Sequence, residues 1–255
     1  MLNFWLNEII KVAVFFLVTF LLGKYLVARG VRVNYTRKIF HFILFFFPIF
    51  LLSIIPFEPS LTTTLLSGGV LLFCLLFMWE PIREKSGFLQ TAYSAIDRPE
   101  DRPYTLVWVS TQILATYIVL LYMLYWLSQY DKTVLIYLSV LVAGIGDGLA
   151  EPVGVRFGKH KYAVKALFTD RTYTRSIEGS ACVFFSGILA VLMLSEQLTT
   201  AQMILAFAII PIVMTLAEAF SPHTWDGPFL YLAGGTSTVL VLELSDLADR
   251  LNFLS

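Results

Sequence analysis

The chain has 255 residues, of which 58% are hydrophobic and only 14% are charged, and its 18 Lys and Arg residues balance its 18 Asp and Glu residues. A soluble domain of this size carries about 25% charged residues, so the composition excludes a globular protein in water. The zero net charge also argues against a nucleic-acid partner. The mean hydropathy of +0.77 and the long apolar runs instead predict an integral membrane protein.

Eight apolar blocks follow one another along the chain. A helix needs roughly 20 apolar residues to cross the hydrocarbon, and most of these blocks approach that length with their flanking residues. The fold class they predict is all-α, a polytopic transmembrane helix bundle of about eight spans that forms one integral membrane domain over residues 1–255. In chain order the blocks are Val12–Leu26, Phe40–Phe57, Thr62–Trp79, Leu106–Leu127, Thr133–Ala150, Ser180–Ser195, Ala201–Ala217 and Phe229–Leu242.

The basic residues are distributed unevenly between alternate loops. Only Lys11, Lys132 and Arg250 fall on one notional side. Cytoplasmic loops carry an excess of Lys and Arg, so we expect both termini to be non-cytoplasmic. The fifteen basic residues on the predicted cytoplasmic side are Lys24, Arg29, Arg32, Arg37, Lys38, Arg83, Lys85, Arg98, Arg102, Arg156, Lys159, Lys161, Lys165, Arg171 and Arg175.

Two long loops, over residues 80–105 and 151–179, lie on this predicted cytoplasmic side, whereas the opposite loops are short. Long loops usually carry function, so we expect the active site at the cytoplasmic face. The charged stretch Ser94–Tyr104 within the first loop is typical of a mobile, solvated segment.

The stretch from Gly144 to Ser180 carries the clearest chemical pattern. Asp147 and Glu151 are four residues apart at the end of an apolar block, so both carboxylates share one face of a helix. Small residues continue that face and would let a backbone or a phosphate approach closely; they are Ala150, Gly154 and Gly158.

Basic and acidic residues follow this face at Arg156, Lys159, Arg175 and Glu178. Carboxylates that can hold Mg²⁺, next to basic side chains that can hold phosphate, are what a metal–nucleotide site requires. The spacing leaves an alternative open, because small residues four apart also pack transmembrane helices and basic residues also set topology. An ionisable residue such as Asp147 at a membrane boundary favours a functional role.

The pattern resembles the CTP-binding signature of the dolichol kinase, phytol kinase and CTP-dependent diacylglycerol kinase family, D-x-x-A-x-x-x-G-x-x-x-G followed by a basic, hydroxyl and acidic element. The matching residues in the second element are Arg175, Ser176, Glu178 and Gly179. The run GDGLAEPVGVRFGKHK is most similar to the phytol and other isoprenoid-alcohol kinases.

Two further patches resemble the same family. Arg37, Lys38 and His41 match its N-terminal R-K-x-x-H element, and Ser221–Gly227 is similar to a short loop before its last helix. The chain departs from the pattern in its spacer from Gly158 to Arg175, which is longer than in the family, and in having Glu151 where the phytol kinase subgroup has Asp.

This resemblance implies a kinase that phosphorylates a membrane-soluble lipid alcohol, of the phytol, polyprenol or diacylglycerol type, with CTP as donor and Mg²⁺ as cofactor. The implied partners are the lipid alcohol within the bilayer, the nucleotide and the membrane. The implied catalytic residues are Asp147, Glu178 and His41, and the implied metal ligands are Asp147, Glu178 and Glu151. The implied nucleotide-binding residues are Ala150, Gly154, Arg156, Gly158, Lys159, Arg175, Ser176, Gly179, Arg37 and Lys38.

Two alternatives stay open at this point. Phosphatidate cytidylyltransferases share much of the central motif but add a basic C-terminal signature, whereas residues 180–255 contain a single basic residue, Arg250. A transporter would place ionisable residues deep in several blocks, and the block interiors here are almost free of them. The sequence leaves the identity of the alcohol and the oligomeric state unassigned.

Overall fold

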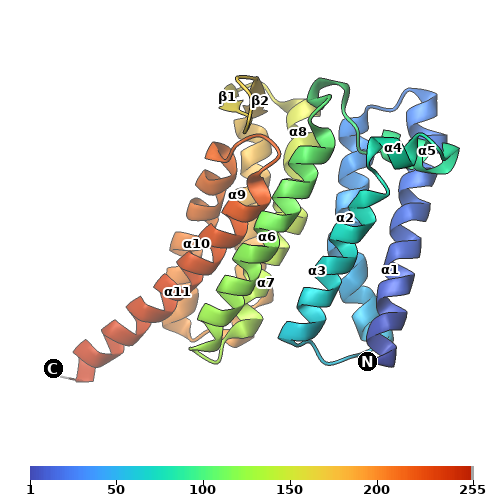
Figure 1. The fold of residues 1–255 in the computed structure, drawn as a ribbon. Coiled ribbons are helices and arrows are strands. Elements are labelled where there is room, and N and C mark those ends of the chain that lie inside the picture. Colours follow the sequence, from blue (N-terminus) through green and yellow to red (C-terminus); the bar gives the residue numbers. More distant parts are fainter. Residues whose placement is uncertain (254–255) are drawn as a thin grey trace. The chain divides into compact units, whose positions relative to one another are not determined.

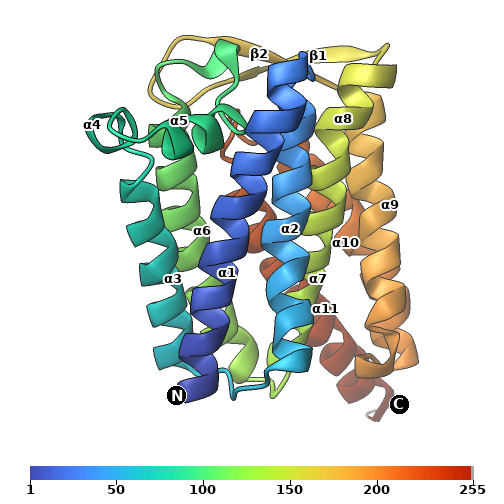
Figure 2. The same ribbon diagram turned by 90° about the vertical axis from the view of Figure 1, so that its right-hand side faces the viewer.

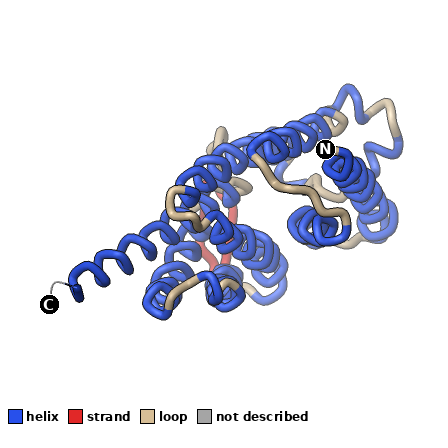
Figure 3. Tube along the Cα trace, turned by 90° about the horizontal axis from the view of Figure 1, so that it is seen from below, coloured by secondary structure: helices blue, strands red, loops and turns tan. Residues whose placement is uncertain are grey.

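The structure is a computed structural model that describes residues 1–253 and divides the chain into two compact units, Met1–Leu114 and Ala115–Ser255. Helices make up most of each unit, and the strands of the described residues form one two-stranded hairpin (Figure 3). The predicted all-helical class is therefore confirmed, apart from this hairpin, which the sequence analysis did not predict. The assignment of residues 1–255 to a single membrane domain stays a prediction.

The first unit begins with a long helical run that ends at Gly30, whose φ of 82° is a left-handed conformation that suits glycine at a helix end. Ser60 and Thr63 then form a capping box at the start of α3. The elements in chain order are α1 (Leu2–Leu21), the π-helical turn η1 (Leu22–Leu26), the 3₁₀ turn η2 (Val27–Arg29), α2 (Val33–Ile54), α3 (Leu61–Leu76), α4 (Glu80–Arg83), α5 (Gly87–Ser94) and the 3₁₀ turn η3 (Pro99–Asp101).

The helix α6 (Thr105–Ser128) begins in the first unit and ends in the second. Within the second unit, α9 packs against both α8 and α10, and α10 packs against α11 (Figures 1 and 2). The remaining elements of this unit are η4 (Thr133–Leu135), α7 (Ile136–Leu141), the π-helical segment η5 (Val142–Asp147), α8 (Gly148–Phe157), β1 (Lys161–Lys165), β2 (Thr172–Ser176), α9 (Ile177–Met193), η6 (Ser195–Gln197), α10 (Thr200–Phe220) and α11 (Asp226–Phe253).

Within residues 1–253, six helical segments are long and apolar enough to cross a membrane, which supports a multi-pass membrane protein. Two shorter apolar helices, α3 and α9, have 16 and 17 residues. Each of these eight helices coincides with one of the blocks marked in the sequence. The six long segments are Leu2–Arg29, Val33–Ile54, Thr105–Ser128, Thr133–Phe157, Thr200–Phe220 and Asp226–Ala248.

The structure corrects the expected place of Lys11, which the sequence analysis assigned to the flank of the first span. The helix α1 begins ten residues earlier than the apolar block, so Lys11 lies inside it and is 9% exposed. Its ammonium group forms an ion pair with Glu8 and donates a hydrogen bond to Ser67 Oγ at 3.2 Å. The pair can lie in an apolar helix because each charge offsets the other.

The segment Ser94–Tyr104 is also different from the solvated loop predicted from its charge. Arg98 pairs with Asp101 at 2.6 Å, and both side chains are at most 4% exposed. Arg102 donates to Asp97 at 2.6 Å, and Thr105 donates to the other carboxylate oxygen of Asp97 at 2.8 Å. Two of its three acidic residues thus have a basic partner three or five positions away, and Thr36 of α2 donates to the Ala95 carbonyl at 2.7 Å. The segment therefore packs against α2.

The hairpin occupies the end of the second unit where α8 ends and α9 begins (Figure 1). Its strands are antiparallel, with Tyr162 opposite Arg175 and Val164 opposite Tyr173. Residues two apart along a strand share a face, so these four side chains lie on one face of the hairpin. His223, in the α10–α11 connection, stacks on Tyr173 with a ring-centroid distance of 3.5 Å. The hairpin is thereby joined to the start of α11.

Candidate active site

Asp147 ends the π-helical segment η5 and is 8% exposed. Extra residues in a helical turn are frequently found at functional sites because they displace the next side chains from the regular helical face. Asp147 lies close enough to Glu218 for their carboxylates to interact electrostatically. The structure therefore brings the residue that opens the predicted signature next to an acidic residue of α10.

The small residues of the signature face the protein's own backbone. A Cβ on Gly158 would lie 2.4 Å from the carbonyl oxygen of Gly154 and 2.8 Å from Ser176. A Cβ on Gly179 would lie 2.6 Å from the carbonyl oxygen of Ala150. These positions need glycine so that α8 can approach the junction between β2 and α9, which is the packing explanation for their spacing.

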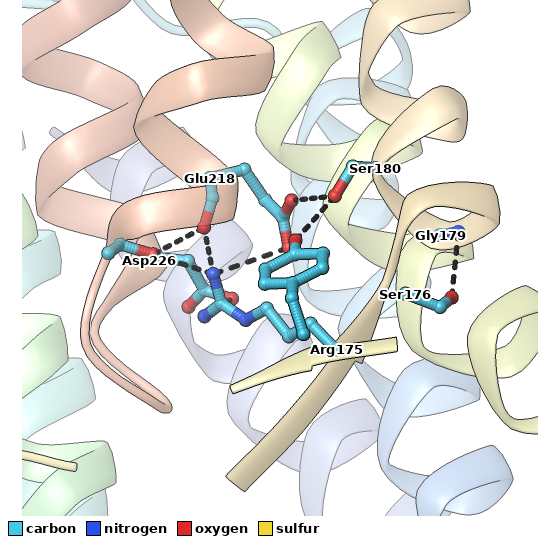
Figure 4. A network of polar contacts seen from close by, with 8 residues as sticks. Arg175, Ser176, Gly179, Ser180, Glu218 and Asp226 are labelled. Carbon is cyan, nitrogen blue, oxygen red and sulfur yellow. Dashed lines mark hydrogen bonds and ion pairs between the residues drawn. The ribbon is translucent and has the colours of Figure 1, made fainter. Parts of the chain in front are cut away.

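Ser176 forms the start of α9, where its Oγ accepts a hydrogen bond from the Gly179 N–H at 3.1 Å. This contact caps the first turn of α9, and Figure 4 shows it beside the site. The basic, hydroxyl and acidic element of the signature is thus the turn from a strand into a helix. Arg175 extends from β2 toward the end of α10, and Ser176 caps the first turn of α9.

Glu178 lies in the first turn of α9, ahead of the apolar block at Ser180–Ser195. Hydrogen bonds from its own backbone amide and from the His160 side chain lower the pKa of Glu178 to about 2. Its Oε1 lies 2.8 Å from His160 Nδ1, and the His160 backbone N–H donates to both carboxylate oxygens at 3.3 Å. Glu178 therefore anchors the start of the hairpin and remains ionised at neutral pH.

Arg175 is the centre of the most extensive polar network in this region (Figure 4). Its Nη1 donates to the backbone carbonyl of Glu218, lies 3.4 Å from Glu218 Oε1, and donates to Ser221 Oγ at 3.1 Å. Its Nη2 lies 4.0 Å from Asp226 Oδ2. The Arg175 side chain is 13% exposed, and Glu218 and Asp226 are 5% and 14% exposed. One guanidinium group is thus shared by two carboxylates.

A short hydrogen-bond chain continues from Glu218. Ser180 Oγ donates to Glu218 Oε2 at 3.0 Å, and Tyr162 Oη lies 2.7 Å from Ser180 Oγ. Ser180 donates its only hydroxyl proton to Glu218, so Tyr162 is the donor to Ser180. Burial, and then the negative charge of Glu218, raise the pKa of Tyr162 above its ordinary value of 10. Tyr162 therefore stays protonated and can keep this donor role at neutral pH.

The remaining predicted residues of the second unit lie around this network. Ala150 is buried, Glu151 and Gly154 are half-buried, and Arg156 and Lys159 are exposed. The two exposed basic residues are accessible to a nucleotide from solution. No group of three or more His, Cys, Asp or Glu side chains in residues 1–253 is placed to hold a metal ion.

Arg37, Lys38 and His41 belong to the first unit, in α2, whereas the other predicted site residues belong to the second. Lys38 is 4% exposed. The His41 ring lies 4.6 Å from the ring of Phe45. Assignment of these three residues to the nucleotide site stays a prediction.

Most of the network around Arg175 is formed by residues outside the predicted site set, namely Glu218, Ser180, Tyr162 and Ser221. From the sequence, Glu218 is open to two interpretations, a charge at a helix end or a group that supports the substrate hydroxyl. Glu218 carries one recognisable signal, an ionisable side chain at the end of an apolar block next to Asp226. Ser221 opens the patch Ser221–Gly227 that resembles a loop of the kinase family. Ser180 and Tyr162 have no signal in the sequence, because their contacts depend on which elements pack together. No protein-family model, curated protein or solved structure matches this chain.

Proposed function

We propose that this protein is a CTP-dependent kinase that phosphorylates a lipid-soluble alcohol at the cytoplasmic face of a membrane. The observation that carries the proposal is the arrangement of Arg175 at the end of a bundle of apolar helices. Its Nη1 is held by Glu218 and Ser221. Its Nη2 forms a long ion pair with Asp226 at 4.0 Å, and neither Nε nor Nη2 makes a hydrogen bond within the described residues. The Nε–Nη2 edge is one of the two-donor edges with which arginine binds a phosphate.

The location also supports a lipid substrate. Arg175 contacts Glu218 and Ser221 at the end of α10, which is apolar enough to cross a bilayer. A site at this helix end would lie where a bilayer-soluble alcohol and a cytosolic nucleotide can meet. Arg156 and Lys159 are exposed and can attract the triphosphate. The resemblance of the signature to CTP-dependent lipid kinases specifies the donor and the acceptor class.

In the proposed reaction the alcohol oxygen attacks the γ-phosphorus of CTP. The bond between that phosphorus and the oxygen bridging to the β-phosphate breaks, CDP leaves, and the hydroxyl proton passes to solvent. Phosphoryl transfer depends mainly on positioning and on neutralising charge. Arg175 would bind the phosphates, and the packed turn at Ser176 would hold Arg175 in place.

The proposal includes Mg²⁺, which would be held by Asp147 with Glu151 or Glu178. Mg²⁺ in such enzymes usually binds one or two carboxylates together with the substrate phosphates. The described residues contain no group of three or more His, Cys, Asp or Glu side chains that could hold a metal ion, and Glu178 already contacts His160. Mg²⁺ would therefore take most of its ligands from the substrate phosphates and water. Mg²⁺ would neutralise phosphate charge during transfer.

The proposed topology has eight spans, with residues 81–104 and 151–178 in the cytoplasm and both termini on the other side. It requires α3 and α9 to cross as well, and at about 1.5 Å per residue they are roughly 24–26 Å long, close to a hydrocarbon thickness of about 30 Å. Single cysteines at Ser86, Thr169 and Ser255, the last outside the described residues, test it after Cys74 and Cys182 are replaced by Ala. Labelling of all three from one side of the membrane would contradict the topology.

The test of function is an assay of the purified protein in lipid vesicles with CTP, Mg²⁺ and a panel of phytol, farnesol, polyprenol and diacylglycerol. The expected products are CDP and one phosphorylated alcohol, with a preference among the four that identifies the acceptor. Pyrophosphate release with phosphatidate as acceptor would instead indicate the cytidylyltransferase alternative. An Asp147→Asn preparation serves as the control for a contaminating kinase.

A further inference from the structure

We propose that Glu218 is a positioning residue that orients Arg175 for the nucleotide. This inference rests on the proposed function and adds a residue that the CTP-binding signature does not contain. Glu218 is 3% exposed, so it is not available to contact a substrate directly. Any effect of Glu218 on the reaction must therefore act through the side chains that it touches.

Glu218 holds the Arg175 Nη1 by two of its atoms. Its backbone carbonyl accepts a hydrogen bond from Nη1, and its Oε1 lies 3.4 Å from the same nitrogen. Ser221 Oγ, 3.1 Å from Nη1, in turn donates to the Glu218 carbonyl at 2.9 Å. The Nη1 donors of Arg175 are thus directed into the end of α10, which leaves Nε and Nη2 on the opposite edge.

The Glu218 carboxylate is itself fixed from the other side. Its Oε2 accepts from Ser180 Oγ at 3.0 Å, and Tyr162 Oη is 2.7 Å from that hydroxyl. Ser180 belongs to α9 and Tyr162 to β1, whose backbone pairs directly with Arg175. The arginine and the carboxylate that holds it are therefore fixed by α9, α10 and the hairpin together (Figure 4). A side chain held at both ends loses little further entropy when a phosphate binds.

Three variants of Glu218 distinguish position from charge. In Glu218→Gln the side chain keeps its length and an oxygen acceptor but loses its charge. In Glu218→Asp it keeps its charge but is one methylene shorter, so its oxygens retreat from Nη1 and from Ser180. Glu218→Ala removes both features. Because we infer that the position of the acceptor matters, we expect Gln to be the mildest change.

The experiment measures KM for CTP, kcat and the thermal unfolding midpoint of the vesicle-embedded wild type and the three variants. We expect KM to rise by about tenfold to 100-fold in Glu218→Ala, in line with the loss of about 1.5–3 kcal/mol for a hydrogen bond to a charged group. Glu218→Asp should be intermediate, and Glu218→Gln should stay within about threefold of the wild type. In an Arg175→Ala background, measured by equilibrium binding of CTP, Glu218→Ala should have almost no further effect.

Other patterns overturn the inference. A near-normal Asp variant with an impaired Gln variant would mean that the charge of Glu218 matters and its position does not. Lower unfolding midpoints with an unchanged KM for CTP would mean a purely structural role. A wild type that neither binds nor consumes CTP would overturn the proposed function, and this inference with it, whereas normal CTP use with a KM unchanged in Glu218→Ala would overturn the inference alone.

Discussion

Each of the two units contains a group of paired charged side chains, and the two groups are built differently. In the first unit Arg98 pairs with Asp101 and Arg102 pairs with Asp97, in both cases at 2.6 Å. In the second unit Arg175 lies between two carboxylates, with Nη1 3.4 Å from Glu218 Oε1 and Nη2 4.0 Å from Asp226 Oδ2.

Under the proposed function, the charged pairs of the first unit stabilise the fold, whereas Arg175 of the second unit binds the nucleotide. A buried one-to-one pair with good geometry mainly fixes local structure, and removal of one partner leaves the other charge buried without compensation. Under the proposed function, the Arg175 guanidinium would exchange its long contact with Asp226 for a phosphate. The comparison predicts that variants of the first group alter stability, whereas variants of the second group alter catalysis.

The largest expected effect is on stability, in Arg98→Ala. The variant leaves Asp101 buried at 2% exposure without its arginine, which should lower the free energy of unfolding by about 3–5 kcal/mol. Thermal unfolding in vesicles measures the loss. Activity per folded molecule should stay unchanged, and a selective rise in KM for CTP would break the comparison. Arg102→Ala, whose side chain is 58% exposed, is the matched control and should cost less.

The next effect concerns the carboxylate that opens the signature. Asp147→Asn keeps the shape of the side chain and removes one charge, so we expect turnover with Mg²⁺ to fall by roughly 10²–10³-fold, the range found for loss of one electrostatic catalytic group. The initial rate of lipid phosphorylation measures it, with the unfolding midpoint as the control for folding. Near-normal turnover would mean that Asp147 serves helix packing or topology.

A smaller effect is expected from Arg175. Arg175→Ala should raise KM for CTP by about 10–100-fold, and Arg175→Lys should recover part of the loss, because lysine supplies the charge without the planar fork. Lys165→Ala, at an exposed position of the same hairpin, is the matched control and should change KM little. Equal, mild effects of Arg175→Ala and Lys165→Ala would show that both residues only set membrane orientation.

The smallest effect is a pH-dependent contribution of the contact between His160 and Glu178. The pKa of Glu178 is lowered from 4.5 to about 2 in the folded state, so the carboxylate stabilises the fold above about pH 4.5, and this contribution is lost as the pH falls toward 2. His160→Ala should therefore lower the unfolding midpoint slightly at pH 6, and the difference from the wild type should shrink below pH 4.5. A constant difference down to pH 2 would contradict this origin of the shift.

The helical fold could be predicted from the sequence because the length and apolarity of a block are local properties. Each of the eight apolar helices lies on a predicted block. The packed conformation of residues 97–105 could not be predicted, because the high charge of this segment is typical of a solvated loop. Only the tertiary fold reveals that Arg98 pairs with Asp101. The place of Lys11 was predicted wrongly for a similar reason, since its pair with Glu8 interrupts the apolar run without ending the helix.

The candidate site could be predicted only in part. The signature led to Asp147, Arg175 and Ser176, because its residues are close in sequence. It did not reveal the hairpin, whose strands are short and polar and whose pairing also involves contacts with the distant His223. The role of Glu218 depends on α10 packing beside β2 and α9, which no local spacing encodes.

The most direct test of the central claim uses CTP labelled separately at the α- and γ-phosphates, with the purified protein, Mg²⁺ and the preferred alcohol in vesicles. A kinase transfers only the γ-label to the lipid and leaves the α-label in CDP, and both signals should fall together in Asp147→Asn and Arg175→Ala. Transfer of the α-label to lipid with release of pyrophosphate would contradict a kinase, and retention of both labels in unreacted CTP would contradict CTP-dependent chemistry altogether.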